Sequence, residues 1–373
     1  MREIISAIKL RPKYCVWELT ARCNMACLHC ASALGEGRSR GEELSPGEAL
    51  KLCAELKELG CETAVLSGGE ALLRADWEAI AEELVRLDIQ VSLISNGLLI
   101  DGEIARRIQR AGLCRVALSL DGLEATHNFI RRNPRSFESV LRAFPLLKNL
   151  GLQVNIVSHV NRRNLPELSG MEDLVASLGV DVWRIQLGSP LGRLAQHPEL
   201  QAFPEDLPAI ADFIVAAKRR GRVEINVCDN IGYFSRHERE LRRGPEPGLF
   251  GFWCGCSAGC LTVGIEANGN VKGCLSLQSD RFIEGNVRRE PLRAIWEKPG
   301  NFAFTRDFRP ENLHGSCRGC EYGEICRGGC TFISVGATGS PHNNPYCLYR
   351  LERAAGKTPP SKHEDVAGIS ADR

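Results

Sequence analysis

Short apolar runs that alternate with amphipathic segments are the feature that most limits how this chain can fold. The six runs are CVWEL (15–19), TAVLS (63–67), QVSLIS (90–95), RVALSL (115–120), QVNIVS (153–158) and DVWRIQL (181–187). Their short length and β-branched content indicate strands, and the segments between them have helical period. Six strand–helix repeats predict a parallel sheet with helices outside it, an α/β fold that can close into a partial (β/α)6 barrel.

The helices can be placed by their start and stop signals. Asp76, Asp101 and Ser136 are predicted N-caps, and Pro145 should interrupt or kink the helix in which it stands. FPEDLPAIADFIVAAKRRG, from residue 203, predicts one more helix before the repeat pattern fades. In folds of this kind, ligands bind at the loops that follow the carboxyl ends of the strands.

Composition excludes several classes of protein. The 373 residues carry a net charge of +1, and the basic runs Arg131-Arg132, Arg162-Arg163, Lys218-Arg219-Arg220 and Arg242-Arg243 are short. These runs are therefore expected to be solvated faces, and a nucleic-acid partner is not expected. No apolar stretch approaches the roughly 20 residues of a membrane span, and MREIISAIKLRPK lacks the apolar centre of a signal peptide. We therefore expect a cytoplasmic protein with no membrane partner, whose thiols remain reduced.

The cysteines are strongly clustered. Of the 17, three lie in 23–30, four in 254–274 and four in 317–330, and Cys347 follows. Clustered cysteines in a reducing compartment predict metal sites rather than disulfides. The five isolated cysteines are expected to be small buried hydrophobes: Cys15, Cys53, Cys61, Cys114 and Cys228.

CNMACLHC (23–30) directly follows the first predicted strand and offers three thiols without a nearby fourth. A tetrahedral zinc site needs four ligands, whereas a 4Fe-4S cubane held by three thiolates leaves one iron open to a substrate or cofactor. This CxxxCxxC loop resembles the signature of the radical S-adenosylmethionine (SAM) enzymes, and the resemblance extends over about residues 14–215. It implies that Cys23, Cys27 and Cys30 are the catalytic cluster ligands and that the open iron binds SAM, with His29 near the adenine.

Later loops resemble the same family in order. LSGGEALL follows the second strand, ISNGLL the third and SLDG the fourth. The resemblance implies a cofactor-binding set made of Gly68, Gly69, Glu70, Ser95, Asn96, Ser119, Asp121 and Arg131, with Gln186 and Leu187 ending the sixth strand near the adenosine. The glycines should let the backbone approach a ligand closely, and Ala71 departs from the family's usual proline. Each motif alone could be an ordinary turn or helix cap, but their succession behind the cysteine loop favours the SAM site.

The cysteine-rich C-terminal region resembles the SPASM extension, which carries two auxiliary 4Fe-4S clusters. The match covers about residues 254–350, where CGCSAGCLTVGIEANGNVKGC includes a hairpin tip at Asn268-Gly269 and CRGCEYGEICRGGC follows. The resemblance implies that Cys317, Cys320, Cys326 and Cys347 bind one auxiliary cluster. The other would take Cys274 and Cys330 with one or two of Cys254, Cys256 and Cys260. The CxAG pattern favours Cys256 as a ligand, whereas a five-residue gap favours the pair Cys254 and Cys260. The alternative to this iron–sulfur domain is a zinc ribbon.

These patterns predict a domain order along the chain. It is a lead-in over 1–14, the radical SAM barrel over 15–215, a bridging region over 216–253 with a boundary loop at GPEPG (244–248), the SPASM domain over 254–350 and a flexible tail over 351–373.

The resemblance implies a radical SAM peptide maturase, which removes hydrogen from a ribosomally made peptide to form a crosslink or an epimer. The partners implied are that peptide, a flavodoxin- or ferredoxin-type electron donor and, since only 22 residues precede Cys23, a separate leader-binding protein. Cys228 could donate a hydrogen atom in an epimerase, although an ordinary core role is the simpler interpretation. One alternative is a sulfatase maturase or another SPASM oxidoreductase, although sulfatase maturases commonly have Asp where Leu275 stands. The other alternative is a non-catalytic metal scaffold or electron carrier.

Overall fold

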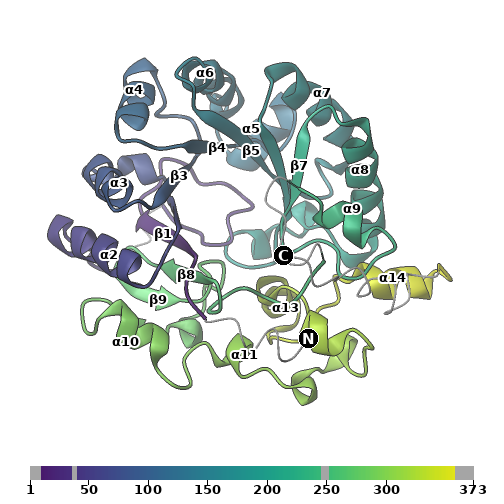
Figure 1. The fold of residues 1–373 in the computed structure, drawn as a ribbon. Helices are drawn as coiled ribbons and strands as arrows, with labels where there is room; N and C mark the ends of the chain where they lie inside the picture. The colour runs from purple at the N-terminus through teal and green to yellow at the C-terminus, as the bar shows by residue number, and fades with distance from the viewer. Residues whose placement is uncertain (1–9, 36–39, 245–251, 358–373) are drawn as a thin grey trace, which may run out of the picture.

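The computed structural model describes residues 10–35, 40–244 and 252–357. Within them, one sheet of 10 strands runs in the order β10-β9-β8-β1-β2-β3-β4-β5-β6-β7. The strands that form its parallel part are β1 (Tyr14–Thr20), β2 (Thr63–Gly68), β3 (Gln90–Ser95), β4 (Arg115–Ser119), β5 (Gln153–Val160), β6 (Val182–Leu187) and β7 (Glu224–Val227). The parallel strands curve around an open interior, and the helices lie outside them (Figure 1). The α/β fold with a partial barrel is therefore confirmed, and β7 adds a strand that the sequence did not predict.

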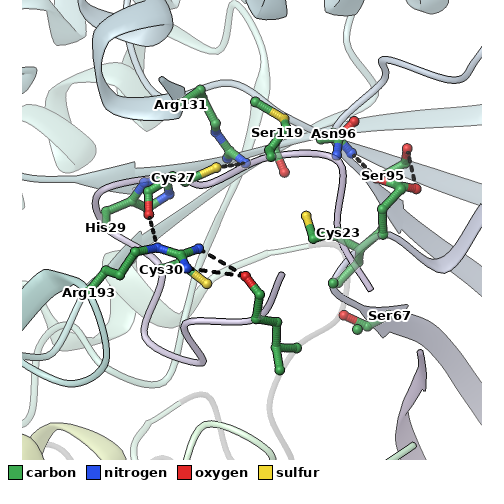
Figure 2. Close-up of a pocket in the computed structure, with 16 residues that line it drawn as sticks. Cys23, Cys27, His29, Cys30, Ser67, Ser95, Asn96, Ser119, Arg131 and Arg193 are labelled. Carbon is green, nitrogen blue, oxygen red and sulfur yellow. Dashed lines mark hydrogen bonds between the residues drawn. The ribbon is translucent and has the colours of Figure 1, made fainter. Parts of the chain in front are cut away.

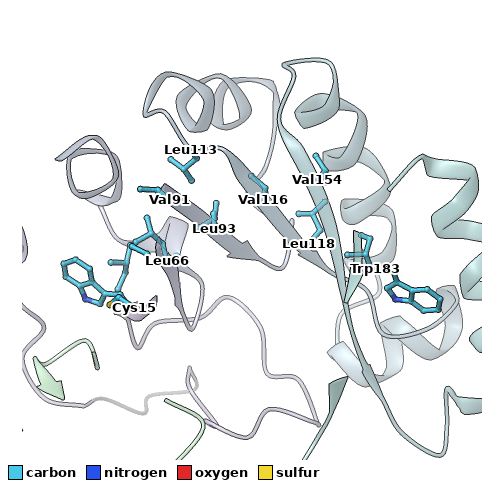
Figure 3. Packing of buried hydrophobic residues seen from close by; sticks show 14 of the residues in the cluster. Cys15, Leu66, Val91, Leu93, Leu113, Val116, Leu118, Val154 and Trp183 are labelled. Carbon is cyan, nitrogen blue, oxygen red and sulfur yellow. The ribbon is translucent and has the colours of Figure 1, made fainter. Parts of the chain in front are cut away.

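Helices follow the strands along the outer face of the sheet. They are α2 (Pro46–Glu58), α3 (Trp77–Arg86), α4 (Gly102–Arg110), α5 (Glu124–Arg131), α6 (Ser136–Lys148), α7 (Leu168–Leu178) and α8 (Leu207–Arg220). Alternate residues of the strands face these helices and form the core, as Figure 3 shows for Leu66, Val91, Leu93, Val116, Leu118, Val154 and Trp183. The intervening strand residues therefore point into the concave interior, where the functional loops meet.

The helix signals were only partly right. Asp101 caps α4, because its carboxylate accepts hydrogen bonds from the backbone N–H groups of residues 103 and 104. Asp76 precedes α3 but makes no cap hydrogen bond, since its carboxylate pairs with Arg74. Ser136 is the first residue of α6 rather than its cap, and its hydroxyl contacts His127 instead. Pro145 lies within α6, which continues to Lys148.

The C-terminal region extends the same sheet. Strand β8 (Thr262–Ile265) pairs in parallel with β1, and β9 (Asn270–Lys272) and β10 (Gly285–Asn286) follow in antiparallel order. The predicted hairpin turn is confirmed, because Gly269 has φ +89° and its N–H donates to the carbonyl of Glu266 between β8 and β9. Short helices complete this region: α9 (Glu238–Arg242), α10 (Leu292–Glu297), α11 (Ala303–Arg306), α12 (Gly323–Cys326), α13 (Thr331–Thr338) and α14 (Leu348–Ala354).

Several sequence expectations differ from the structure. The tail predicted to be flexible begins inside α14, where Glu352 is buried, and residues 358–373 lie outside the described residues. The predicted boundary loop at 244–248 also lies outside them except for its first residue. Arg131 and Arg242 are buried within runs expected to be solvated, and Cys114 is exposed rather than buried. None of the described helices is long and apolar enough to span a membrane.

Candidate active site

The loop that holds the first three clustered cysteines, here called the cluster loop (residues 21–35), leaves the carboxyl end of β1. Helix α5, which is distant in the sequence, anchors its backbone, because the N–H of Leu28 donates to the carbonyl of Ile130 at 2.9 Å. Burial raises the pKa of Cys23 to about 11. Burial also raises the pKa of Cys27, but the nearby Arg131 guanidinium opposes that shift. Since metals bind thiolates, the positive charge of Arg131 favours the form of Cys27 that a cluster needs.

The two glycines of LSGGE allow close contact between protein segments. A Cβ on Gly68 would lie 2.4 Å from the carbonyl oxygen of Thr20, and a Cβ on Gly69 would lie 2.1 Å from that of Arg22. The N–H of Gly69 donates to the Thr20 carbonyl and that of Glu70 to the Arg22 carbonyl, both at 2.9 Å. Only glycine fits at these two positions, because the end of β2 packs closely against the end of β1 and the start of the cluster loop. The expectation that these glycines also let the backbone approach a ligand closely stays a prediction, since both of them line the cavity described below.

Glu70 carries a buried carboxylate at the end of β2. Its oxygens accept hydrogen bonds from the Ser95 hydroxyl at 3.0 Å and from the backbone N–H of Asn96 at 2.9 Å. Burial raises the pKa of Glu70, and these hydrogen bonds from Asn96 and Ser95 lower it. The Asn96 amide also donates to Asn24 of the cluster loop at 2.7 Å. The motifs after β2 and β3 thus form one network that reaches the cluster loop.

Asp121 and Arg131 form a buried ion pair behind the site. The Arg131 Nε donates to Asp121 at 2.6 Å, and its Nη1 lies 3.9 Å from the Cys27 sulfur. Burial alone would raise the pKa of Asp121, but Arg131 lowers it well below its usual range. The carboxylate also accepts the backbone N–H of His159 at 2.8 Å. Asp121 therefore fixes the orientation in which Arg131 presents its charge to Cys27.

His29 lies between this ion pair and the interior. Its ring stacks on that of His159 with a centroid distance of 4.9 Å, and its Nε2 lies 3.4 Å from the Asp121 carboxylate. Burial lowers the pKa of His29 well below its ordinary value and that of His159 to about 4. Both imidazoles are therefore neutral at physiological pH. The buried Nδ1 of His29 has no protein hydrogen-bond partner, so a bound ligand could satisfy it.

A cavity of about 180 Å³ opens among these groups. The sulfurs of Cys23, Cys27 and Cys30 point toward a common central space, beside which Arg131, Ser119 and Asn96 lie (Figure 2). The lining contains most of the predicted site residues, namely the three cysteines, His29, Gly68, Gly69, Glu70, Ser95, Asn96, Ser119 and Arg131. It also contains Met25, Leu34, Ser67, Ile94 and Arg193, which the sequence did not identify. The dipeptide Gly192-Arg193 just after the sixth strand was the available signal for the last of these.

Three predicted cofactor residues do not line this cavity. Asp121 lies behind Arg131 and acts through it. Leu187 is 2% exposed and packs into the main core, and its N–H donates to Asn230. Gln186 instead accepts a weak contact from the Cys228 thiol at 3.6 Å.

Cysteines of the C-terminal region form two groups of interacting thiols. In the first group, burial and then Cys256 raise the pKa of Cys274 and of Cys330, and Cys256 also raises that of Cys260. Cys260 and Cys274 flank the β8–β9 hairpin, and Cys330 directly precedes α13. Segments far apart in the sequence are thus brought together by the hairpin and the helix.

The second group contains Cys317, Cys320, Cys326 and Cys347. Burial raises the pKa of Cys326 well above its ordinary value, and Cys347, Cys317 and Cys320 raise it further. Burial likewise raises the pKa of Cys347 to about 12, with Cys320 and Cys317 adding to the shift. Such mutual repulsion of thiolates disappears when a cationic metal centre binds them.

Cys254 shares part of its electrostatic surroundings with the first group. Burial and then Asp229 raise its pKa, while Arg327 and Arg242 lower it. After burial, Asp229 also raises the pKa of Cys256 and of Cys330. The thiol of Cys256, however, is the one that raises the pKa values of Cys260, Cys274 and Cys330.

The donor chemistry suits iron–sulfur clusters rather than single ions. Within the residues that the structure describes, no three His, Cys, Asp or Glu side chains converge closely enough to hold one metal ion. A tetrahedral zinc site needs sulfurs only about 3.8 Å apart, from a Zn–S distance of about 2.3 Å, whereas a cubane is larger and holds its thiolates further apart. Thiols gathered in groups of three and four therefore fit 4Fe-4S clusters.

Comparison with protein families agrees with this geometry. The profile of the Radical SAM superfamily matches residues 17–165, and that of the SPASM iron–sulfur cluster-binding domain matches residues 256–321. An AdoMet-dependent heme synthase of Methanosarcina barkeri is 31% identical over 347 residues, which cover 91% of this chain and 97% of that protein. The mycofactocin maturase MftC of Mycolicibacterium smegmatis is 29% identical over 334 residues, covering 88% of this chain and 80% of the relative.

Solved structures share the fold. That of anSMEcpe with bound AdoMet has a TM-score of 0.71 at 20% identity and covers 92% of this chain and 94% of that one. That of Streptococcus suis SuiB has a TM-score of 0.70 at 16% identity, with 90% and 76% coverage. The predicted family, cofactor classes and enzymatic nature are thus confirmed. The chain belongs to the radical SAM superfamily, whose enzymes use a 4Fe-4S cluster and S-adenosylmethionine, and it carries a C-terminal SPASM iron–sulfur domain.

Proposed function

We propose that this protein is a radical SAM maturase that modifies a ribosomally made peptide. The observation that carries the proposal is the joint presence in one chain of an open three-thiol site and two further thiol groups. The 29% identity to a mycofactocin maturase over most of both chains supports a peptide substrate. When bound, the SAM cluster would supply the electron that cleaves SAM to methionine and a 5′-deoxyadenosyl radical, which takes a hydrogen atom from the substrate.

Residues of the cavity would bind and orient the cofactors. Cys23, Cys27 and Cys30 would hold the SAM cluster. Glu70, fixed by Ser95 and Asn96, would accept hydrogen bonds from the SAM amino group. Arg131 would present its guanidinium to the cluster and the SAM carboxylate, with Asp121 as its positioning partner. The unpartnered Nδ1 of the neutral His29 ring would accept a hydrogen bond from the adenine, whose amino group is a donor.

The two C-terminal thiol groups would hold the auxiliary clusters. The electrostatic neighbours support Cys256, Cys260, Cys274 and Cys330 as one ligand set, and Cys317, Cys320, Cys326 and Cys347 as the other. Cys254 would then be no ligand, because Cys256 is the thiol of this stretch that raises the pKa of the other three members of the first set. We further propose a ferredoxin- or flavodoxin-type donor, a separate leader-binding protein and a cytoplasmic location, which the free state of all 17 cysteines supports.

A second candidate function is synthesis of a heme-type tetrapyrrole. It is favoured by the heme synthase relatives of Methanosarcina barkeri and Oleidesulfovibrio alaskensis, which are 31% and 32% identical over at least 90% of this chain. Both candidates would use the same SAM site, so the substrate distinguishes them.

The test is anaerobic co-expression of the chain with any small peptide encoded beside its gene, followed by mass spectrometry of the peptide and of extracted tetrapyrroles. A mass change in the peptide that disappears in a Cys27→Ala variant supports the maturase. An unchanged peptide together with a new tetrapyrrole would establish the second candidate instead. SAM cleavage with neither product would exclude both substrates and leave the radical SAM assignment intact.

A further inference from the structure

A short segment after β6 contacts both the cluster loop and the SPASM region. We call residues 188–194 the connector. It lies beyond the part of the chain that matches the Radical SAM profile, which ends at residue 165, and before the SPASM match, which begins at residue 256. Neither family match assigns it a role.

At one end of the connector, Arg193 binds the carbonyl groups of the cluster loop. Its Nε donates to the carbonyl of Cys27 at 2.8 Å, and both Nη atoms donate to that of Leu34 at 3.2 Å (Figure 2). Its backbone N–H donates to the carbonyl of Cys30 at 3.0 Å. One residue thus holds three carbonyls, two of which belong to proposed cluster ligands. A planar guanidinium is suited to this task, because it donates in several fixed directions at once.

The residue before it requires an equally close fit. Gly192 has φ +58°, and a Cβ there would lie 2.2 Å from the carbonyl oxygen of Ala31 and 2.6 Å from that of Cys30. No side chain can occupy that space without moving the cluster loop. The connector backbone therefore packs directly on the cluster loop at its third cysteine and at the residue after it.

At its other end, the connector packs against α13. The hydroxyl of Ser189, which is 1% exposed, donates to the carbonyl of Phe332 at 3.2 Å. A Cβ on Gly336 would lie only 1.7 Å from that hydroxyl oxygen. Helix α13 begins directly after Cys330, a member of the first auxiliary thiol group. Gly336 therefore allows the connector to pack against α13, the helix that follows Cys330 of the first auxiliary thiol group.

The first and last residues of the connector, Gly188 and Leu194, make further close contacts. A Cβ on Gly188 would lie 2.1 Å from the His159 Nε2, so the connector starts in contact with the histidine pair. Leu194, at 1% exposure, packs with Ile130 and Leu200, and Leu28 of the cluster loop lies against them. Ser189 and Leu194 are buried and the other connector residues are half-buried, and a segment with such close contacts at both ends transmits displacement rather than absorbing it.

From these contacts we propose that the connector couples the two kinds of metal centre, with Arg193 as the positioning residue that holds the cluster loop in register with α13. The proposal uses the ligand roles proposed above for Cys27, Cys30 and Cys330, but it does not depend on which substrate the enzyme modifies. A disturbance at α13 should therefore reach the SAM site through Ser189, Gly192 and Arg193.

The experiment uses the full chain, reconstituted anaerobically with iron and sulfide. Three quantities are measured without substrate: iron per chain, the dissociation constant of SAM, and the change that SAM causes in the EPR spectrum of the dithionite-reduced protein. The last reports only the cluster with an open iron. A Cys23→Ala, Cys27→Ala, Cys30→Ala triple variant gives the baseline for the auxiliary clusters.

Arg193→Met keeps an unbranched side chain of similar length but removes every donor. We expect SAM to bind at least about tenfold more weakly, the size expected from lost charge-assisted hydrogen bonds. The SAM-dependent EPR change should shrink while the auxiliary spectrum stays as in the triple variant. Arg193→Lys should restore part of both, since an ammonium can serve some of the carbonyls. Wild-type SAM affinity and EPR response in Arg193→Met would overturn the proposal.

The other end is tested by Gly336→Val, with Ala337→Val as its matched control on an exposed position of the same helix. Gly336→Val should weaken SAM binding and alter the SAM-dependent EPR change although it lies on α13, and Ala337→Val should alter neither. A Gly336→Val protein that loses auxiliary iron but responds to SAM normally would refute the coupling. If Gly336→Val does not fold, the Arg193 pair of variants decides the question.

Discussion

Replacing Asp121 by Asn tests the electrostatic arrangement behind the SAM site. Asp121 is 1% exposed and its partner Arg131 is 12% exposed, so both charges are removed from water. Asn is nearly isosteric and still offers an oxygen to the backbone N–H of His159, which Asp121 accepts at 2.8 Å. What the substitution removes is the negative charge that faces the guanidinium. Arg131 is then a buried cation beside Cys27 without its carboxylate.

The size of the effect follows from that burial. Breaking a buried ion pair by removing one partner costs roughly 3–5 kcal/mol, because the remaining charge stays desolvated. Since Asn keeps one acceptor, we expect a value near the lower end, about 3 kcal/mol. For a chain of this length, that loss corresponds to a decrease in Tm of about 4 °C. The pKa of Asp121 is depressed in the folded state, so its contribution is present above about pH 4 and is lost as the pH falls further.

The assay is anaerobic thermal unfolding at pH 7, followed by the fluorescence of the buried tryptophans. Asp212→Asn is the matched control, because Asp212 pairs with Arg236 at 3.1 Å but is 53% exposed. Such a pair contributes about 0–1 kcal/mol, so the control should change Tm very little. If the two variants unfolded at the same temperature, the Asp121–Arg131 pair would not be the buried electrostatic anchor described above. SAM binding measured in parallel should weaken only in Asp121→Asn.

Three further predictions concern other parts of the molecule. Cys256→Ala should lose about four of the roughly 12 irons of three 4Fe-4S clusters, whereas Cys254→Ala should retain them, which iron analysis checks. Gly69→Ala would place a Cβ 2.1 Å from a backbone carbonyl oxygen of the cluster loop and should abolish the SAM-dependent EPR change; Gly47→Ala, where a Cβ meets nothing within 4 Å, should leave it intact. Burial lowers the pKa of Lys218 to about 8, below about 10.4 in the unfolded chain. The unfolded chain therefore binds more protons between those values, and stability should rise from pH 8 to about 10.4 relative to a Lys218→Met variant.

The barrel was predictable because local pattern and tertiary role agree. Apolar residues alternate with others along β2 to β6, and the alternate positions form the core against the helices. The short β7 was missed, because EINV follows a charged run and offers only two strongly apolar residues. Ser136 was misplaced as a cap, since sequence alone does not show that its hydroxyl is needed by His127.

Site residues were predictable where a motif follows a strand directly, and they were missed where the contact is made by a connection. Arg193 lies 163 residues from Cys30 in the sequence, so no local pattern links them. The backbone contacts of Gly68 and Gly69 were missed for a related reason. A glycine signals that something comes close, but the sequence does not say whether it is a ligand or, as here, another backbone segment.

The relation between the SAM site and the auxiliary thiols has a second physical basis besides the connector. Strand β8 pairs in parallel with β1 from Tyr14–Thr262 to Trp17–Ile265, so the strand that leads into the cluster loop also carries the hairpin flanked by Cys260 and Cys274. A hydrogen-bonded register fixes relative position along the strands to one residue, because slippage would turn every core side chain outward. The β1–β8 pairing and the connector are therefore two separate sets of contacts that join the cluster loop to the C-terminal region. Because the parallel ladder does not involve Arg193, its loss should reorient the cluster loop without separating the two domains, which is why the auxiliary spectrum can serve as the internal control.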